Sequence, residues 1–225
     1  KGTFTENLDV GGLARPIPVD WNNDGKKDLI VGNNFGQVTY FRNIQSDHAP
    51  LFASGTTIQI GSPTRTALDV GAYATPVVVD WNNDGKKDLI IGNSDGNVYC
   101  ALNIGTDDNP AFGTLTKLST PDSQIDVGGY AVPFVIDYNG DHNKDLIVGD
   151  ADGYLTPFLN IGTDKAPILD KGKRLRIEGE GDIDRNRIPL LLGLVTAPQA
   201  CFIRLAAQHP RADDTILRCR LRRCE

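Results

Sequence analysis

Three nearly identical blocks along the chain constrain its fold more strongly than any other feature. They read DWNNDGKKDLIVGN from Asp20, DWNNDGKKDLIIGN from Asp80 and DYNGDHNKDLIVGD from Asp137, so consecutive copies lie 60 and 57 residues apart. Flanking blocks recur in the same register, with LDVGGLARP, LDVGAYATP and IDVGGYAVP upstream and NIQSDHAPLF, NIGTDDNPAF and NIGTDKAPIL downstream. Chance does not align three blocks three times, so the chain is built from a repeated structural unit.

Each unit has the pattern of four short β-strands. In the second unit the apolar run Pro76–Val79 precedes the block, Asp88–Gly92 lies inside it, and Asn97–Asn103 and Phe112–Leu118 follow. These runs are too short for helices, and residues 1–184 show no apolar period of helical length. Four antiparallel strands per unit predict an all-β fold of β-propeller blades. A parallel β-solenoid is the alternative, although its repeat is usually shorter.

The boundaries of the repeats predict three blades and two flanking segments. We assign residues 1–12 to the outer strand of a preceding blade, 13–67 to blade 1, 68–124 to blade 2, 125–184 to blade 3 and 185–225 to an anomalous tail. About four to eight blades close a propeller, so three predict an incomplete ring or one that oligomerisation completes. Open sheet edges attract other strands, which favours a homo-oligomer.

The tail differs from the repeats in charge and cysteine content. Residues 1–184 hold 15 basic and 26 acidic side chains, whereas residues 185–225 hold 8 basic and 3 acidic ones. All 8 basic residues of the tail are Arg, and three of the four Cys lie there. This break indicates either truncation or an out-of-frame extension, or else a divergent capping segment with a helix near residues 198–208. The chain also begins at Lys1 and contains no Met, which we expect of a processed protein or a fragment.

The repeated block places oxygen-bearing residues at alternate positions of a loop. Asp20, Asn22, Asp24 and Asp28 offer side-chain oxygens at positions 1, 3, 5 and 9, and Lys26 offers its backbone carbonyl at position 7. Ca²⁺ takes about six to eight oxygen ligands, and no His or Cys occupies these positions. The same set recurs as Asp80, Asn82, Asp84, Lys86 and Asp88, and again as Asp137, Asn139, Asp141, Asn143 and Asp145. The sequence therefore predicts three Ca²⁺ sites.

The predicted loop differs from an EF-hand and from a solvated turn. Position 12 is Val31, Ile91 or Val148 rather than the bidentate Glu of an EF-hand, and the residues after the loop are strand-like. Asp and Asn favour turns without any ion, but three crowded carboxylates would repel one another without a cation. In the third loop His142 replaces the glycine of position 6. We expect a weak affinity, about 10⁻⁴–10⁻³ M, and a role in stability rather than signalling.

These residues carry a resemblance to a known family. DWNNDGKKDLIVGN, followed by Gly36-Gln37-Val38 and Asn43-Ile44, resembles the FG-GAP/VCBS repeat of calcium-binding β-propellers. Integrin alpha-subunit heads, many secreted bacterial proteins and a fungal seven-bladed lectin use such blades. The resemblance covers about residues 1–180 and implies Ca²⁺ at the loop positions named above, in a secreted or cell-surface protein. It does not specify function, because one fold hosts many functions.

Several other classes of function lack support in the sequence. His48, His142 and His209 occupy no equivalent repeat positions and have no Ser or Cys partner pattern, so we expect no enzyme. The many carboxylates are better explained as Ca²⁺ ligands than as a glycosidase pair. The net charge of −6 argues against a nucleic-acid partner, and no apolar run is long enough for insertion into a membrane.

Aromatic residues supply the candidates for a ligand site. Those that follow the first loop ligand are interpreted as core or inter-blade packing: Trp21, Trp81 and Tyr138. Tyr73 and Tyr130 lie in the loops that enter two blades, at a propeller face, where a Tyr ring can stack on a sugar while Asp69 or Asp126 bonds its hydroxyls. The resemblance to lectin-type members makes a calcium-stabilised, non-catalytic, carbohydrate-binding module the leading expectation. A protein–protein adhesion module of the integrin-like type and an architectural domain of a larger secreted enzyme are the alternatives.

Overall fold

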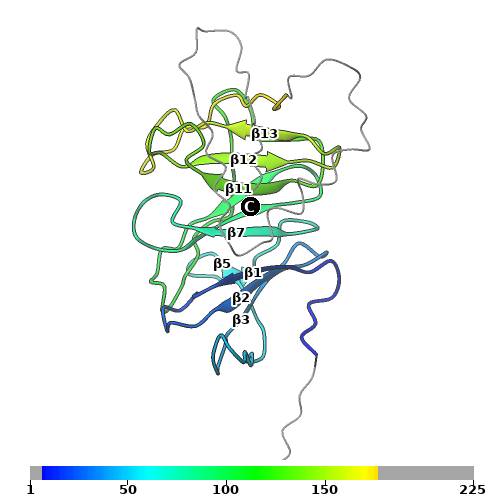
Figure 1. Cartoon of the computed structure of the whole chain (residues 1–225), viewed down its shortest axis with the longest axis vertical. Helices are drawn as coiled ribbons and strands as arrows, with labels where there is room; N and C mark the ends of the chain where they lie inside the picture. The colour runs from blue at the N-terminus through cyan, green and yellow to red at the C-terminus, as the bar shows by residue number, and fades with distance from the viewer. Residues whose placement is uncertain (1–6, 177–225) are drawn as a thin grey trace, which may run out of the picture. The chain divides into compact units, whose positions relative to one another are not determined.

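The computed structural model describes residues 7–176, which form an all-β structure (Figure 1). The chain separates into two compact units, Lys1–Lys173 and Arg174–Glu225, and all the described strands belong to the first. Residues 174–176, the described part of the second unit, contain no helix or strand. None of the described residues lies in a helix, so this part of the chain offers no membrane-spanning helix. The predicted all-β fold class is confirmed, whereas the predicted tail 185–225 and its helix lie outside the described residues.

Each repeat folds into an antiparallel sheet whose strands follow one another in chain order. We call these three sheets blades 1, 2 and 3. Blade 1 contains β1 (Arg15–Val19), β2 (Asp28–Gly32), β3 (Val38–Phe41) and β4 (Thr56–Thr57). Blade 2 contains β7 (Thr75–Val79), β8 (Asp88–Gly92), β9 (Val98–Ala101) and β10 (Thr116–Lys117). Blade 3 contains β11 (Val132–Ile136), β12 (Asp145–Gly149) and β13 (Leu155–Phe158).

The outer edges of the blades differ in detail from the predicted strands. The strand predicted at Phe112–Leu118 is reduced to β10, and Phe112 instead forms isolated bridges to Asn103 and Ile60. An unpredicted two-stranded sheet pairs β5 (Gln59–Ile60) with β6 (Thr66–Ala67). In blade 3 the described residues form three strands, and residues 171–176, which follow them, contain no strand.

The first three strands of every blade pair in the same register. Ile17 lies opposite Ile30 in blade 1, and Val77 lies opposite Ile90 in blade 2. The inner strands β1, β7 and β11 lie next to one another, as Figure 1 shows, because each blade packs against the following one. The identity of the three blocks therefore extends from sequence to strand pairing.

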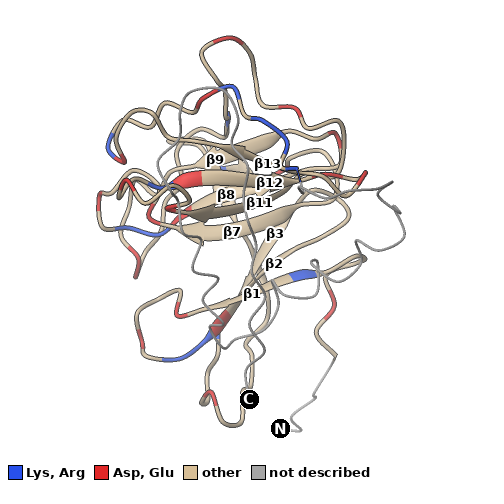
Figure 2. Ribbon diagram, turned by 45° about the horizontal axis from the view of Figure 1, so that its top comes forward, with Lys and Arg blue, Asp and Glu red and all other residues tan. Residues whose placement is uncertain are grey.

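The hydrophobic core consists of two layers between neighbouring blades. In the first layer, Ile30 and Val38 of blade 1 cluster with Leu89 and Ile91 of blade 2. The second layer joins the other face of blade 2 to blade 3 in the same way. The middle strand β8 is buried on both faces, which explains why its sequence is continuously apolar rather than alternating. Charged side chains lie mainly in the loops between strands (Figure 2).

Of the three aromatic residues predicted to pack in the core, Trp21 and Trp81 lie in the two layers, whereas Tyr138 is half-buried and belongs to neither. Trp21 is 2% exposed and belongs to the first layer, where its ring lies 6.0 Å from that of Phe112. Trp81 is 4% exposed and belongs to the second layer. The packing role predicted for these two residues is confirmed.

A glycine at the end of the middle strand allows each following blade to approach closely. A Cβ added at Gly32 would lie 2.2 Å from the carbonyl oxygen of Ala74, and one added at Gly92 would lie 2.0 Å from that of Ala131. The amides of Ala74 and Ala131 in turn donate to the carbonyls of Asn33 and Asn93, both at 2.9 Å. Neighbouring blades are thus joined by backbone as well as by apolar side chains.

This close approach predicts a large cost for one added methyl group. Gly92→Ala should lower the free energy of unfolding by about 1–3 kcal/mol, because Cβ would overlap a backbone carbonyl that cannot move independently. The matched control is Gly113→Ala, whose Cβ would meet nothing closer than 3.6 Å. Urea unfolding of both variants tests the prediction. Equal stability of the two variants would contradict it.

Candidate functional site

The three predicted metal loops connect β1 to β2, β7 to β8 and β11 to β12, and each wraps around its first aspartate. In blade 1 the two oxygens of Asp20 accept from the amides of Asp24 at 3.0 Å and Gly25 at 2.9 Å. The second loop repeats this pattern at 3.0 and 2.8 Å, and the third at 3.1 and 3.0 Å. The amide group of Asn22 also donates to the carboxylate of Asp24 at 3.1 Å. The side chains at positions 1, 3 and 5 are therefore brought together in every loop.

The third loop keeps the same backbone conformation despite lacking the glycine of position 6. Gly25 and Gly85 have φ of 83° and 86° at that position, and His142 has φ of 70°. A residue with a Cβ pays about 1–2 kcal/mol for this left-handed conformation. At position 4 the third loop has Gly140 where the others have an Asn with φ of 57°, so its glycine has moved two residues along the same turn.

The aspartate at position 9 is the most buried part of each loop. Asp28, Asp88 and Asp145 are all 0% exposed. Asp28 accepts from the amide of Trp21 at 3.1 Å and from that of Asn43 at 2.7 Å. The other two blades contain the same pair of bonds at 2.7 to 2.9 Å. One carboxylate thus ties the start of the metal loop to the segment that leaves the third strand.

Burial and a neighbouring carboxylate raise the proton affinity of two of these groups, Asp88 and Asp145. Burial raises the pKa of Asp88, the backbone donors oppose that rise, and the charge of Asp84 adds to it. Burial and the charge of Asp141 likewise raise the pKa of Asp145. The carboxylates at positions 5 and 9 therefore repel each other, which is the situation that a bound cation relieves.

The donor set of each loop fits a hard cation such as Ca²⁺. It comprises three carboxylates, one side-chain amide and one backbone carbonyl, all of them oxygen donors. Within residues 7–176 no three His, Cys, Asp or Glu side chains converge tightly enough to form a metal cluster by themselves. Two of the predicted ligands, a side-chain amide and a backbone carbonyl, are not His, Cys, Asp or Glu side chains. The carboxylate at position 9 accepts hydrogen bonds from backbone amides. The predicted ligands Lys26, Lys86 and Asn143 stand at position 7, where each donates its own amide to the aspartate of position 5 at 3.1, 3.0 and 2.8 Å.

A further aspartate, not identified from the sequence, supports each loop from outside. Asp47, Asp107 and Asp164 accept from the backbone amide at position 8 at 2.6, 2.8 and 2.7 Å. The ammonium groups of Lys87 and Lys144 also reach their aspartates, at 2.7 and 2.8 Å. The signal was the aspartate that recurs in the downstream blocks NIQSD and NIGTD.

In blade 2 this support also links two loops. Lys87 donates to the side-chain oxygen of Asn23 in the first loop at 2.5 Å, and Asn23 donates to Asp107 at 3.3 Å. Although partial burial opposes its ionisation, the bonds from Lys87 and Asn23 hold the pKa of Asp107 below its usual value. Asp107 is therefore a charged anchor for both loops.

Removal of the Asp107 carboxylate should destabilise both loops. Asp107→Ala should destabilise the protein by about 1–3 kcal/mol, because Lys87 loses a charge-assisted partner and its amide loses an acceptor. Asp108→Ala, which removes the neighbouring carboxylate, is the matched control and should have a small effect. Thermal and urea unfolding of both variants measures the difference. The anchoring role is excluded if the two substitutions cost the same.

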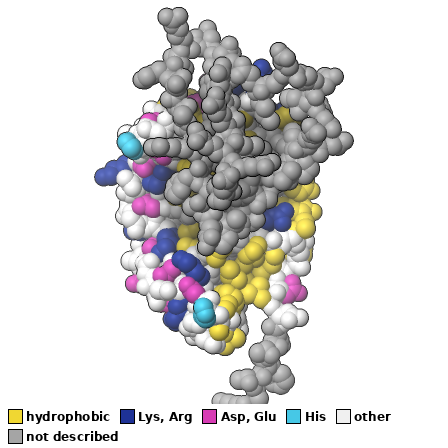
Figure 3. Space-filling view, in the orientation of Figure 1, with side chains coloured by type: hydrophobic (Ala, Val, Ile, Leu, Met, Phe, Trp, Pro, Cys, Tyr) yellow, Lys and Arg dark blue, Asp and Glu magenta, His cyan; other side chains and the backbone are white. Residues whose placement is uncertain are grey.

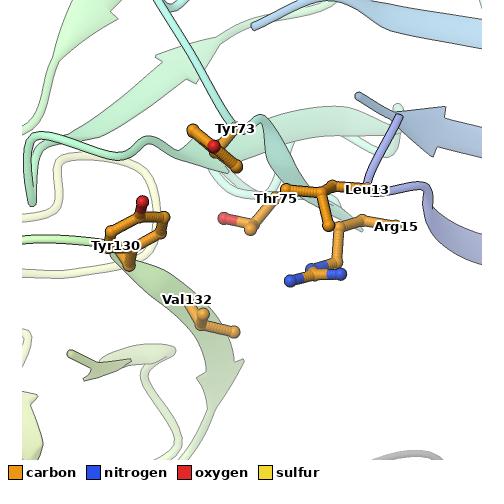
Figure 4. A pocket seen from close by; sticks show the side chains of 6 residues that line it. All are labelled: Leu13, Arg15, Tyr73, Thr75, Tyr130 and Val132. Atoms are coloured by element: carbon orange, nitrogen blue, oxygen red, sulfur yellow. The ribbon is translucent and has the colours of Figure 1, made fainter. Parts of the chain in front are cut away.

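The two tyrosines predicted as ligand residues lie side by side. Tyr73 and Tyr130 have φ of 55° and 44°, and their ring centroids lie 5.0 Å apart with an edge-on orientation. A hydrogen bond with the hydroxyl of Tyr73 raises the pKa of Tyr130. They line a small hollow of about 40 Å³ together with Leu13, Arg15, Thr75 and Val132 (Figure 4). Such a hollow holds a few waters, so a sugar would have to lie across the exposed rings.

The two aspartates predicted beside these tyrosines are occupied by the backbone. Asp69 accepts from the amide of Gly71 at 2.7 Å, and Asp126 accepts from that of Gly128 at 2.8 Å. Neither aspartate lines the hollow. They shape the glycine turn that carries each tyrosine, and their contact with a ligand stays a prediction.

A larger crevice of about 410 Å³ lies between blades 1 and 2 and was not anticipated. Arg42, Arg65, Asp107 and Asp108 line it, together with Trp21, whose buried Nε1 has no hydrogen-bond partner among the described residues. Its size suits a small ligand. The repeat pattern does not predict this crevice, because it forms where two repeats pack and because the other repeats have leucine in place of Arg42.

Comparisons with known proteins give one family match over part of the chain and one distant structural likeness. Residues 80–148 match the model of the FG-GAP-like repeat. No curated protein sequence matches the chain. A solved structure of the Photorhabdus luminescens Tc holotoxin pore, mutation TccC3-D651A, aligns at 21% identity with a TM-score of 0.44. The alignment covers 74% of this chain and 7% of that chain.

Proposed function

Because this chain carries the FG-GAP-like repeat, confirmed over residues 80–148, we propose that it is a calcium-stabilised, non-catalytic β-propeller module that binds carbohydrate. FG-GAP repeats often bind Ca²⁺. The observation that carries the metal part of the proposal is the threefold recurrence of one loop geometry, with the same two bonds around its first aspartate. The metal would be held by the oxygens at positions 1, 3, 5, 7 and 9.

Bound Ca²⁺ would supply positive charge to each loop and so offset the repulsion between its carboxylates. Cationic side chains also lie close to these carboxylates. Asp24 lies 3.3 Å from the guanidinium of Arg42 and 3.7 Å from the ammonium of Lys26. Asp84 lies 3.7 Å from Lys86. These contacts favour a site in which a cation is needed for stability rather than for chemistry.

Chelation of Ca²⁺ should therefore lower the melting temperature. A site filled at a concentration 100-fold above its Kd stabilises the folded state by about 2.7 kcal/mol, so adding EGTA should lower Tm by about 5–10 °C for each such site. The double substitution Asp24→Ala plus Asp84→Ala should remove most of this EGTA sensitivity. Calorimetry with and without EGTA measures both effects.

The control removes two carboxylates outside the metal loops. Asp95→Ala plus Asp152→Ala changes the charge by the same amount in the hairpins that follow β8 and β12. This variant should keep the EGTA sensitivity of the original protein. A protein whose Tm is unaffected by EGTA would contradict the calcium proposal.

The carbohydrate part of the proposal is supported by the tyrosine pair, in which Tyr130 is exposed and Tyr73 is half-buried. Tyr130 is 49% exposed, and its ring offers an apolar face beside two hydroxyl groups. Sugars present apolar C–H faces and hydroxyls together, so an aromatic surface with polar groups nearby suits them. Arg15 and Thr75 add polar groups at the same hollow. A ligand of this kind, and a weak Ca²⁺ affinity, both suit a secreted or cell-surface protein.

Loss of the two rings should abolish sugar binding without unfolding the protein. On a glycan array, Tyr73→Ala and Tyr130→Ala should each reduce binding at least tenfold, because each removes part of the stacking surface. Phe35→Ala removes an aromatic ring that is 60% exposed outside the hollow, and Arg65→Ala changes the crevice, so both should bind normally. Unchanged binding by both tyrosine variants, with native circular dichroism, would contradict the proposed sugar site.

A further inference from the structure

We propose that blade 3 docks onto blade 1 of a second copy of this chain, in a head-to-tail contact that repeats the packing between neighbouring blades. The two internal contacts, blade 1 on blade 2 and blade 2 on blade 3, use the same residue positions. In each contact, one blade presents the face that is turned toward the next blade, which we call its leading face. The next blade presents the face that is turned back toward the first, which we call its trailing face. The leading face of blade 3 and the trailing face of blade 1 have no such counterpart among the described residues.

The leading face of blade 3 is apolar and exposed where its equivalents are covered. Leu155 is 40% exposed, whereas Val98 and Val38 at the same repeat position are 0% exposed. Phe134 and Ile136 of β11 are 45% and 44% exposed and point to the same side of the strand, since they are two residues apart. In Figure 3 apolar side chains gather in the lower half of the view, at the height of β1 and β7 in Figure 1.

The trailing face of blade 1 is open in the same way. Leu8 is 43% exposed, whereas Leu68 and Ile125 at its repeat position are 0% and 2% exposed. Pro16 is also exposed, and its equivalents in the other blades are buried. One chain therefore carries both halves of the contact, each left without its counterpart among the described residues.

Two glycines of blade 3 indicate what kind of surface should cover it. Gly32 and Gly92 are needed because a carbonyl of the next blade lies where their Cβ would be. Gly149 holds the same repeat position, but a Cβ there would meet nothing closer than 3.5 Å. Gly153 differs from its equivalents in the same way. A Cβ added at Gly36 or Gly96 would meet the glycine turn of the next blade, whereas one added at Gly153 would have nothing within 4 Å. Both positions leave room for the backbone of another blade.

The segment that fits this room is the LDVGGLARP block of a second copy. Val70 and Val127 donate their amides to the carbonyls of Gly36 and Gly96 at 3.0 Å, so Val10 of the second copy would donate to Gly153. The chain's own residues after Asp184 lack the VGG and Pro pattern that such a contact needs. A segment of the same chain would also leave the trailing face of blade 1 open, whereas a second copy covers both faces at once.

Head-to-tail docking also satisfies the geometry of closed propellers. A contact between unlike faces forms either a ring or an open filament. Two copies supply about six blades, which lies within the range of about four to eight that closes a propeller. The expected product is therefore a dimer with two equivalent contacts.

The test measures the mass of the full chain in calcium-containing buffer by light scattering over a range of concentrations. The expected mass is twice 24.4 kDa, with dissociation on dilution. Gly149→Ala should shift the mass to that of a monomer at the same concentration, because its Cβ would overlap the carbonyl of Ala14 in the second copy. Phe134→Asp should do the same by placing a charge in the contact. Gly113→Ala is the control and should remain dimeric.

Each other outcome overturns the proposal. A full chain that is monomeric at all concentrations excludes a second copy as the partner. If Gly149→Ala lowers the Tm of such a monomer, the chain covers its own blade 3. A dimer whose mass is unchanged by both Gly149→Ala and Phe134→Asp associates through another surface. Native circular dichroism of the Gly149→Ala variant separates lost docking from lost folding, since the monomer itself has space for the methyl group.

Discussion

Each repeat buries one carboxylate completely, and the sheet around it is arranged to stabilise that charge. An unpaired buried charge is costly, and Asp28, Asp88 and Asp145 avoid this cost through two backbone amides each, one after each of the two strands that flank the middle strand. Those two bonds fix the start of the loop and the exit from the third strand. The loop then places its remaining carboxylates next to the buried one, where the proposed Ca²⁺ would offset their repulsion.

The same loops also set the spacing of the blades. Asp107 holds the second loop and contacts Asn23 of the first, so the polar loops are linked in parallel with the apolar layers beneath them. At the opposite end of the strands, Gly32 and Gly92 admit the backbone of the next blade. Blades 1 and 2 are therefore joined at both ends of their strands, and blades 2 and 3 are joined at Gly92 and through their apolar layer, as expected of a fold built from repeats that cannot bury their faces alone.

Much of this architecture could be predicted from the sequence because the repeats restate it three times. Strand positions, loop composition and the packing of Trp21 and Trp81 follow from local patterns that recur in register. The roles of Asp107 and Asp69 could not be assigned, because each acts through a backbone amide supplied by another segment. The pairing of Tyr73 with Tyr130 and the crevice at Arg42 likewise depend on how two blades meet. The hairpin β5–β6 and the short strand β10 depend on outer segments that differ most between repeats.

Direct counting of bound ions is the best test of whether the three loops hold calcium. Equilibrium dialysis of the full chain against Ca²⁺, followed by metal analysis of the protein, gives the stoichiometry without relying on stability or activity. We expect three Ca²⁺ ions per chain at saturation. A chain that binds no Ca²⁺ at millimolar concentrations would contradict this expectation.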